Sequence, residues 1–189
     1  MCNFVSAYIQ ILMSDIMTSA QRHYNMSRIH GKDTDIELLV RKRLHASGFR
    51  FRLNVRDLPG RPDIVLPKYR TVIFVNGCFW HGHKECRLFV MPKTNTAFWS
   101  DKIERNRERD DEKFRQLEAL QWNVLVVWEC ELKKDRIDGT IEQLASNIRE
   151  NGSRWEKEKT DRRANRKEYR QWRRAVKEKE QAFKAGTRR

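Results

Sequence analysis

The stretch that decides the fold, residues 60–86, reads GRPDIVLPKYRTVIFVNGCFWHGHKEC. It holds a short apolar run at residues 64–66 and a continuous one at residues 72–75. A continuous apolar run predicts a strand that is buried on both faces, which requires cover on either side of the sheet. The stretch ends in a segment rich in Cys and His, so residues that can bind a metal or transfer a proton follow this strand directly.

The elements around this stretch predict an α/β architecture with a mixed sheet. Upstream, residues 33–48 have the apolar spacing of a helix, with Thr34 and Glu37 as a capping box and Gly48 as terminator. Apolar and polar residues then alternate over residues 49–55, which predicts a half-buried strand. Downstream we expect a helix over 96–120, a buried strand over 122–130 and a helix over 140–149. The order is helix, three strands, helix, strand, helix.

Composition narrows the classes of protein. The chain has 189 residues and a net charge of +14, which favours a polyanionic partner. It contains no stretch approaching the roughly 20 apolar residues of a membrane span. Its four Cys do not resemble a disulfide framework, and its N-terminus lacks the features of a secretory signal. We therefore expect a protein of the reduced cytoplasm.

The charge is concentrated near one end. Residues 151–189 contain fifteen basic and six acidic residues, a net charge of +9, whereas residues 1–150 carry only +5. This tail consists mostly of good helix formers, and two interpretations stay open: a solvated helix, or an accessory arm that binds phosphates. We expect an N-terminal extension over 1–17, a central domain over 18–150 and a basic helical tail over 151–189.

A metal-like cluster follows the buried strand. Cys78, His81, His83 and Cys86 lie within nine residues, and Cys130 ends another expected strand. Zinc favours four Cys and His ligands, so three Cys and one His would complete a structural site. The two His are two positions apart and would point opposite ways in an extended segment, so either can be the fourth ligand. The alternative is that the Cys are small buried residues and the His incidental.

A second cluster is acidic. Asp63 precedes the short apolar run, Glu37 lies in the first helix, and His81 lies just past the central strand. Two carboxylates and a His suit a Mg²⁺-dependent phosphodiesterase, in which the metal neutralises phosphate charge and the His takes a proton from water. The alternatives are that Asp63 is a turn residue and that Glu37 serves only the capping box.

Aromatic residues accompany these clusters. Phe79 and Trp80 lie inside the Cys/His segment, and Trp99 follows in the sequence FWSDK. On a basic protein, exposed aromatic rings can wedge between base steps. Alternatively, the rings pack around the metal site as a small satellite core.

The motifs together resemble one known family. Residues 58–89, 92–110 and 120–130, with GRPD, GCFWHGH and VWEC as the most specific motifs, resemble the very short patch repair (Vsr) endonucleases. Residues 25–54 match the N-terminal helix region of that family, and the likeness covers roughly residues 18–132. It implies the α/β core of PD-(D/E)xK restriction endonucleases. It also implies nicking of double-stranded DNA on the 5′ side of a thymine mispaired with guanine, the product of 5-methylcytosine deamination.

The resemblance also implies roles at the active site. Asp63 matches the aspartate that binds Mg²⁺, and Val75 falls where a backbone carbonyl is a ligand. His81 matches the histidine that activates water, and Glu37 the glutamate that supports the site. Asn76 departs from the pattern, because some members have a histidine there. The glutamate and lysine of restriction enzymes are also missing from the strand at residues 71–77.

Further roles concern zinc and DNA. The residues that match structural zinc ligands are Cys78, His83, Cys86 and Cys130. Those that match DNA-contacting residues are Phe79, Trp80 and Trp99, intercalating from the major groove, and Met26, near the minor groove. The implied partners are double-stranded DNA with a T·G mismatch and mismatch-repair proteins, for a monomer at the cytoplasmic nucleoid. Two alternatives stay open: a nicking or restriction-type endonuclease with another target, and a zinc-stapled DNA-binding module without catalysis.

Overall fold

The computed structural model describes residues 18, 20–21, 24 and 33–186. The expectations for the 1–17 extension and for Met26 therefore lie outside the described residues. Within the described part the elements alternate between helix and strand, and the predicted α/β class is confirmed.

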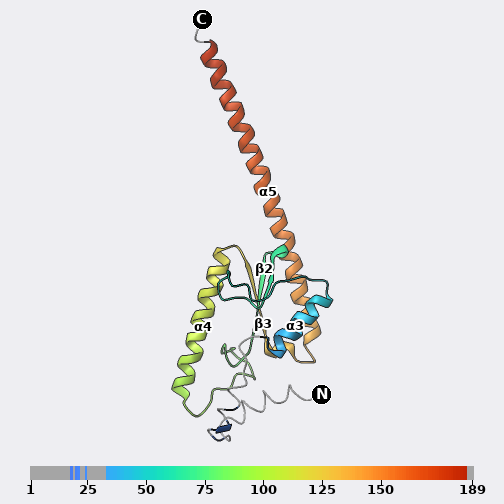
Figure 1. Cartoon of the computed structure of the whole chain (residues 1–189), viewed down its shortest axis with the longest axis vertical. Coiled ribbons are helices and arrows are strands. Elements are labelled where there is room, and N and C mark those ends of the chain that lie inside the picture. The colour runs from blue at the N-terminus through green and yellow to red at the C-terminus, as the bar shows by residue number, and fades with distance from the viewer. Residues whose placement is uncertain (1–17, 19, 22–23, 25–32, 187–189) are drawn as a thin grey trace.

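A three-stranded mixed sheet forms the centre of the molecule (Figure 1). Its strands are β1 (Ile64–Leu66), β2 (Thr71–Asn76) and β3 (Asn123–Trp128), in that order. β1 pairs antiparallel with β2, and β2 pairs parallel with β3. The central position of β2 explains its continuous apolar run, since five of its six residues are buried.

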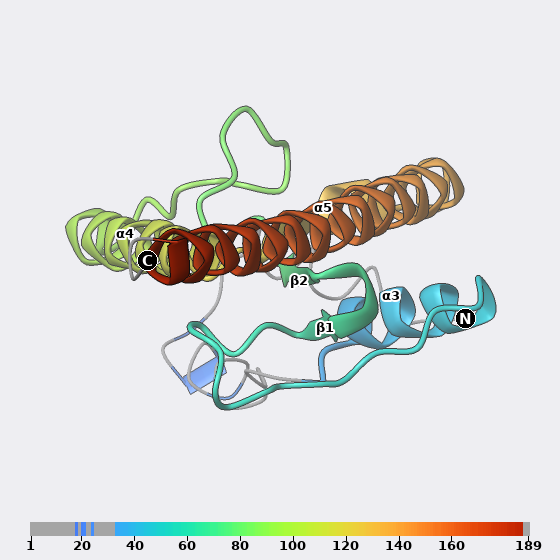
Figure 2. The same cartoon turned by 90° about the horizontal axis from the view of Figure 1, so that it is seen from above.

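Helices cover both faces of the sheet (Figures 1 and 2). On one face lies α4 (Thr96–Ala119), whose Leu117 packs with Val72 and Phe74 of β2. On the other face lie α3 (Asp35–Ala46) and α5 (Ile137–Gly186), which bury Ile73 and Val75 in the larger core. Successive residues of β2 thus face opposite helical layers. Two short 3-10 helices, η1 (Pro67–Tyr69) and η2 (Glu129–Leu132), follow β1 and β3.

Two strand predictions need correction. Residues 49–55 do not form a strand, and only Arg52 makes an isolated bridge, to Val65. β1 offers three residues for pairing, and Asn54 adopts a left-handed conformation (φ 46°) that turns the chain away. β3 is mostly half-buried rather than buried, with Val127 as its buried residue, because it is the edge strand of the sheet.

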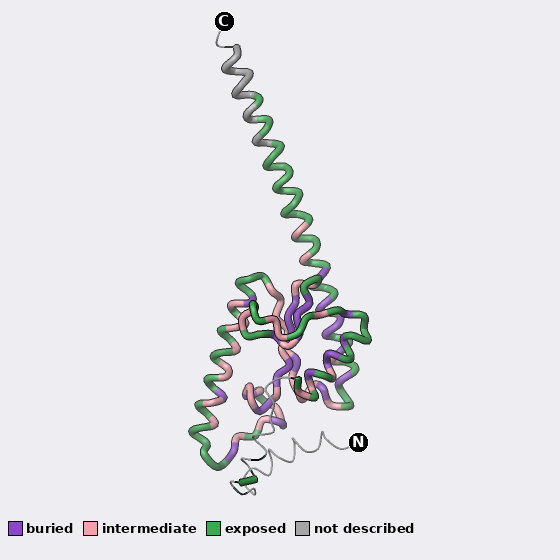
Figure 3. The backbone as a smooth tube through the Cα atoms, in the orientation of Figure 1, coloured by how far each residue is buried: buried purple, intermediate pink, exposed green. Residues whose placement is uncertain are grey.

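The helix expected over 140–149 and the basic tail form one continuous helix. α5 spans 50 residues and passes the expected boundary at residues 150–151 without a break. Gly152 lies within this helix and packs tightly on Tyr69: an added Cβ would lie 2.5 Å from Cδ1, so the position has no room for a side chain. Gly152 is the last buried residue among those described, and from residue 160 onward every described side chain is exposed (Figure 3). Among the described residues, no helix is long and apolar enough to cross a membrane.

Candidate active site and metal cluster

Asp63 lies at the end of β2 because it directly precedes the antiparallel strand β1. The backbone N–H of Val75 donates to Oδ2 of Asp63 at 2.8 Å. In an extended strand the N–H and C=O of one residue point to the same side, so the Val75 carbonyl also faces the Asp63 side. The Val75 side chain is 7% exposed and belongs to the core. Only the backbone of Val75 can therefore serve a ligand here.

The surroundings of Asp63 disfavour its ionised form. Burial raises the pKa of Asp63 to about 6, and the negative charge of Glu37 adds to this rise. The Val75 hydrogen bond and the positive charges of Arg41 and His81 oppose it. A divalent cation beside the carboxylate would offset the desolvation, so Asp63 and the neighbouring carbonyl fit the oxygen donors that Mg²⁺ prefers.

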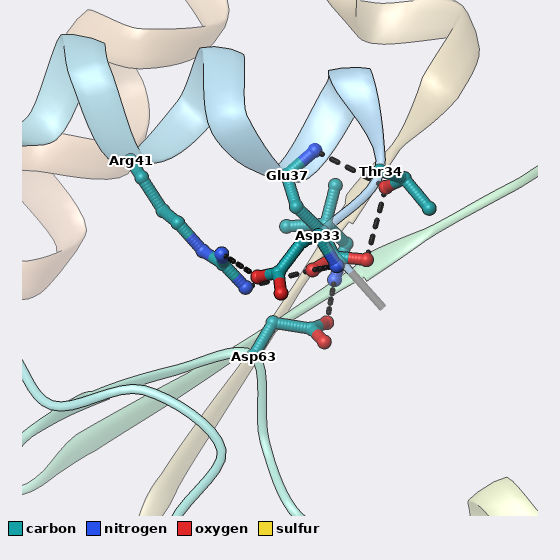
Figure 4. A network of polar contacts seen from close by, with 6 residues as sticks. Asp33, Thr34, Glu37, Arg41 and Asp63 are labelled. Carbon is teal, nitrogen blue, oxygen red and sulfur yellow. Dashed lines mark hydrogen bonds and ion pairs between the residues drawn. The ribbon is translucent and has the colours of Figure 1, made fainter. Parts of the chain in front are cut away.

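Glu37 is held in a buried network at the start of α3 (Figure 4). Its Oε1 accepts from the hydroxyl of Thr34 at 2.9 Å, and its Oε2 accepts from the N–H of Asp33 at 3.0 Å. Arg41, one turn along the helix, donates to the same Oε2 at 2.7 Å and to Asp33 Oδ1 at 2.5 Å. Glu37 is 4% exposed and thus a fixed buried carboxylate facing Asp63.

Only one of the two hydrogen bonds of the expected capping box forms. Thr34 Oγ1 accepts from the Glu37 N–H at 3.4 Å, as an N-cap does. The Glu37 carboxylate does not return to the Thr34 N–H, because Arg41 and the Asp33 N–H hold it. Glu37 therefore combines helix capping with a place in the polar network.

His81 pairs with a residue that the sequence reasoning missed. His81 Nδ1 lies 2.5 Å from Oδ2 of Asp110, which comes from the middle of α4. This contact leaves Nε2 as the ring nitrogen that can accept a proton from water. Asp110 carries no local signal, since it lies in a run of charged residues, ERNRERDDE, on an amphipathic helix.

Cys78, His83, Cys86 and Cys130 come together, and their ligand atoms all lie within 4.8 Å of one another. His83 Nδ1 lies 3.5 Å from Sγ of Cys78 and 3.4 Å from Sγ of Cys130. Tetrahedral zinc with Zn–S bonds of ~2.3 Å would place sulfur atoms ~3.8 Å apart, so the group fits a four-coordinate metal. The structure brings His83, and not His81, into this group.

The neighbours of the Cys/His group fix its shape. The His83 ring stacks on Trp128 at 4.0 Å with an angle of 2° between the planes. Burial raises the pKa of the Cys78 thiol and that of the Cys130 thiol. A bound cation would instead stabilise the thiolates, so the donor chemistry suits a metal.

Gly82 separates the two histidines for a steric reason. Its φ is +57°, and an added Cβ would lie 2.6 Å from Cγ2 of Ile103 and 2.5 Å from the guanidinium of Arg107. Arg107 also donates to the Gly82 carbonyl. The segment is thereby pressed against α4, which directs His81 to Asp110 and His83 to the Cys group.

The aromatic residues pack on one another. The Phe79 ring contacts Trp80 at 5.2 Å and Trp99 at 5.3 Å between centroids, and Phe79 is 6% exposed. Trp80 and Trp99 are half-buried, 5.9 Å apart. Phe98, which the sequence reasoning did not select, is 54% exposed and lies edge-on to Trp99. The cluster thus consists of one buried ring, that of Phe79, and partly exposed rings packed around it.

Comparison with known proteins defines the class of protein. A sequence model of the family described as DNA mismatch endonuclease Vsr matches residues 14–88. The type II nicking enzyme V.NmeAIP of Neisseria meningitidis serogroup A is 50% identical over 125 residues, 66% of this chain and 89% of that enzyme. The type II nicking enzyme V.XorIIP of Xanthomonas oryzae pv. oryzae is 51% identical over 120 residues, 64% of this chain and 88% of that enzyme. The class is that of DNA endonucleases.

The family follows from a third relative. The DNA mismatch endonuclease Vsr of Escherichia coli (strain K12) is 47% identical over 121 residues, 64% of this chain and 77% of that enzyme. This chain belongs to the Vsr family of DNA mismatch endonucleases. The family predicted from GRPD, GCFWHGH and VWEC is thereby confirmed.

Proposed function

We propose that this protein is a Mg²⁺-dependent endonuclease that nicks double-stranded DNA on the 5′ side of the thymine in T·G mismatches. Such mismatches arise from 5-methylcytosine deamination. The observation that carries the proposal is the common location of Asp63, Val75 and His81: Asp63 accepts from the Val75 N–H, and His81 is near enough to lower the pKa of Asp63. Family membership supports the same activity.

Each residue at this edge has a distinct proposed role. Asp63 and the Val75 carbonyl would hold Mg²⁺, which would neutralise charge on the scissile phosphate. His81 accepts a proton at Nε2 from the attacking water, because Asp110 engages Nδ1 and orients the ring. Glu37 supports the site as a carboxylate that Arg41 holds in place beside Asp63. Asn76, which stands where some members of the resembled family have a histidine, is 5% exposed at the end of β2, so the proposal assigns the proton transfer to His81.

We assign a structural role to zinc. Cys78, His83, Cys86 and Cys130 would occupy all four positions of a tetrahedral ion, which is typical of structural rather than catalytic zinc. The group joins the segment after β2 to the start of η2 after β3. Zinc would thus tie together the two chain segments that leave the catalytic edge of the sheet.

Mismatch selection is assigned to the aromatic cluster. Trp80 and Trp99 are partly exposed and would enter the base stack from the major groove, with Phe79 beneath them. Insertion costs least where pairing is weak, so a T·G pair favours it. The Met26 contact in the minor groove belongs to the same proposal.

The wider assignments rest on the same grounds. We assign the nuclease to residues 18–150, with the PD-(D/E)xK restriction-endonuclease fold, because a mixed sheet carries helices on both faces. We also propose that the protein acts as a monomer at the cytoplasmic nucleoid, alongside mismatch-repair proteins. Membership of a family of DNA mismatch endonucleases supports mismatched DNA as the partner.

A nicking assay on labelled duplexes tests the function. Duplexes with T·G, C·G and other mismatches are incubated with Mg²⁺ or with EDTA, and the cut strand and position are read on a sequencing gel. The proposal expects one nick, 5′ of the mispaired thymine, only with Mg²⁺. Equal cleavage of paired DNA would favour a restriction-type enzyme. No cleavage of any duplex would favour a DNA-binding module without catalysis.

A further inference from the structure

Most of the described part of α5 beyond the core is exposed to solvent. α5 leaves the domain at residues 151–155, where Asn151 Nδ2 donates to the Tyr69 carbonyl at 2.6 Å and to Thr71 Oγ1 at 3.0 Å. Trp155 is half-buried beside Arg70, whose guanidinium lies 5.2 Å from its ring. From residue 160 onward every side chain whose burial the structure describes is exposed (Figure 3). We call residues 156–186 the α5 arm.

Basic residues along the end of α5 differ in their partners. Near the core, three of them pair within the helix: Arg154 with Glu150 at 3.3 Å, Lys159 with Glu156 at 2.5 Å and Arg162 with Glu158 at 3.7 Å. Further out, Arg163, Arg166 and Arg170 make no such ion pair within the described part of the chain. The sequence explains this difference, since none of the three has an acidic residue three or four positions away.

Like charges instead occupy those positions. Arg163 has Lys159 and Lys167 four positions away, and Arg166 has Arg162 and Arg170. Such pairs destabilise an isolated helix, and an exposed helix has no packing to offset them. A polyanion along this surface would reverse the sign of the effect, because each added positive charge would then gain a counter-charge.

The unpaired charges also share one face. At about 100° per residue, Arg163, Arg166 and Arg170 fall within about 60° of one another. Asp161 and Glu168 fall on the opposite side of the helix. The basic face therefore presents a row of guanidinium groups with the acidic side chains turned away, which is complementary to a phosphate backbone.

The direction of α5 separates this face from the catalytic edge. Asp63 accepts a hydrogen bond from Val75 near one end of β2, whereas α5 leaves the core beside Thr71 at the other end. Those two positions of the strand are ~13 Å apart. The helix then continues from residue 155 to residue 186, ~46 Å at 1.5 Å per residue, away from the core (Figure 1).

We propose that the basic face of the α5 arm binds the phosphate backbone of duplex DNA, on a segment other than the one held at the catalytic edge. The arm would keep the enzyme on DNA through a second, sequence-independent contact. The inference does not depend on mismatch selectivity, so a fully paired duplex is a sufficient probe.

The experiment uses full-length protein and a matched pair of variants. Arg166→Gln/Arg170→Gln removes two charges from the basic face, and Arg154→Gln/Lys157→Gln removes two from the other side of the same helix. Gln preserves helix propensity, which circular dichroism verifies. Protein is loaded without Mg²⁺ onto a bead-bound T·G duplex, and capture of a second, fluorescent and fully paired 30-bp duplex is measured against salt.

We expect the unmodified protein and the Arg154/Lys157 variant to capture the second duplex. The Arg166/Arg170 variant should capture about tenfold less at low salt, with a log–log salt slope shallower by about 1.8, for two lost phosphate contacts. Its nicking of a T·G duplex should remain unchanged. Absence of capture by the unmodified protein, or equal capture by both variants, would overturn the proposal. Weaker binding of the bead-bound duplex alone would place the arm on the cleaved segment, and a changed oligomeric state would indicate a second copy; either result overturns it.

Discussion

Replacing Asp63 with Asn is expected to stabilise the metal-free protein while abolishing nicking. Burial raises the pKa of Asp63 from 3.8 to about 6, so its ionised form costs about 3 kcal/mol in the folded state. Asn can still accept from the Val75 N–H, but burying its amide N–H groups carries a desolvation cost of its own, which offsets part of the gain. The expected net gain at pH 7.5 is about 1–2 kcal/mol.

The pH dependence of this gain has a definite sign. Because the folded pKa lies above the unfolded one, the native state binds more protons between pH ~4 and ~6, and stability falls as pH rises through that window. Asp63→Asn lacks this loss. Its advantage should therefore be full above pH ~6 and should shrink toward zero near pH 4.

Urea unfolding followed by tryptophan fluorescence measures the effect, in buffer without Mg²⁺ or chelator and with zinc content matched between samples. The exposed Asp57→Asn is the control and should leave stability unchanged. Added Mg²⁺ should narrow the gap by stabilising only the protein that retains Asp63. Equal stability of Asp63→Asn and the unmodified protein at pH 7.5, or the same gain in Asp57→Asn, would refute the burial argument.

Three further changes test the remaining parts of the site. Cys130→Ser should lose zinc and destabilise the domain, because a structural metal contributes folding energy; unchanged zinc by elemental analysis contradicts this. Trp80→Ala should weaken binding of a T·G duplex about tenfold more than binding of paired DNA, whereas an equal loss in titrations of both indicates a packing role. Asp110→Asn should lower the nicking rate constant up to ~100-fold with DNA affinity retained, and an unaltered single-turnover rate would exclude its positioning of His81.

Local pattern was sufficient for the central elements. The apolar run of β2 and the helical spacing of α3 and α4 depend on neighbours in the chain, and these elements lie where the pattern predicted them. The residues at 49–55 also alternate, yet they form no strand, because pairing requires a partner and β1 offers only three residues. Alternation shows that a segment can be a strand, and the length of its partner decides whether it is.

The same division applies to the site. By itself, the sequence determined the family, the kinds of side chain available and their place after the buried strand, since these follow from residue identity and spacing. Tertiary structure alone decided that His83 joins the Cys group, that His81 meets Asp110, and that α5 leaves the core at the end of β2 away from Asp63. Several of these contacts join residues that are far apart in the chain, and they send two histidines that are only two positions apart to different partners. They depend on how α4 and α5 pack across the sheet, which no local periodicity encodes.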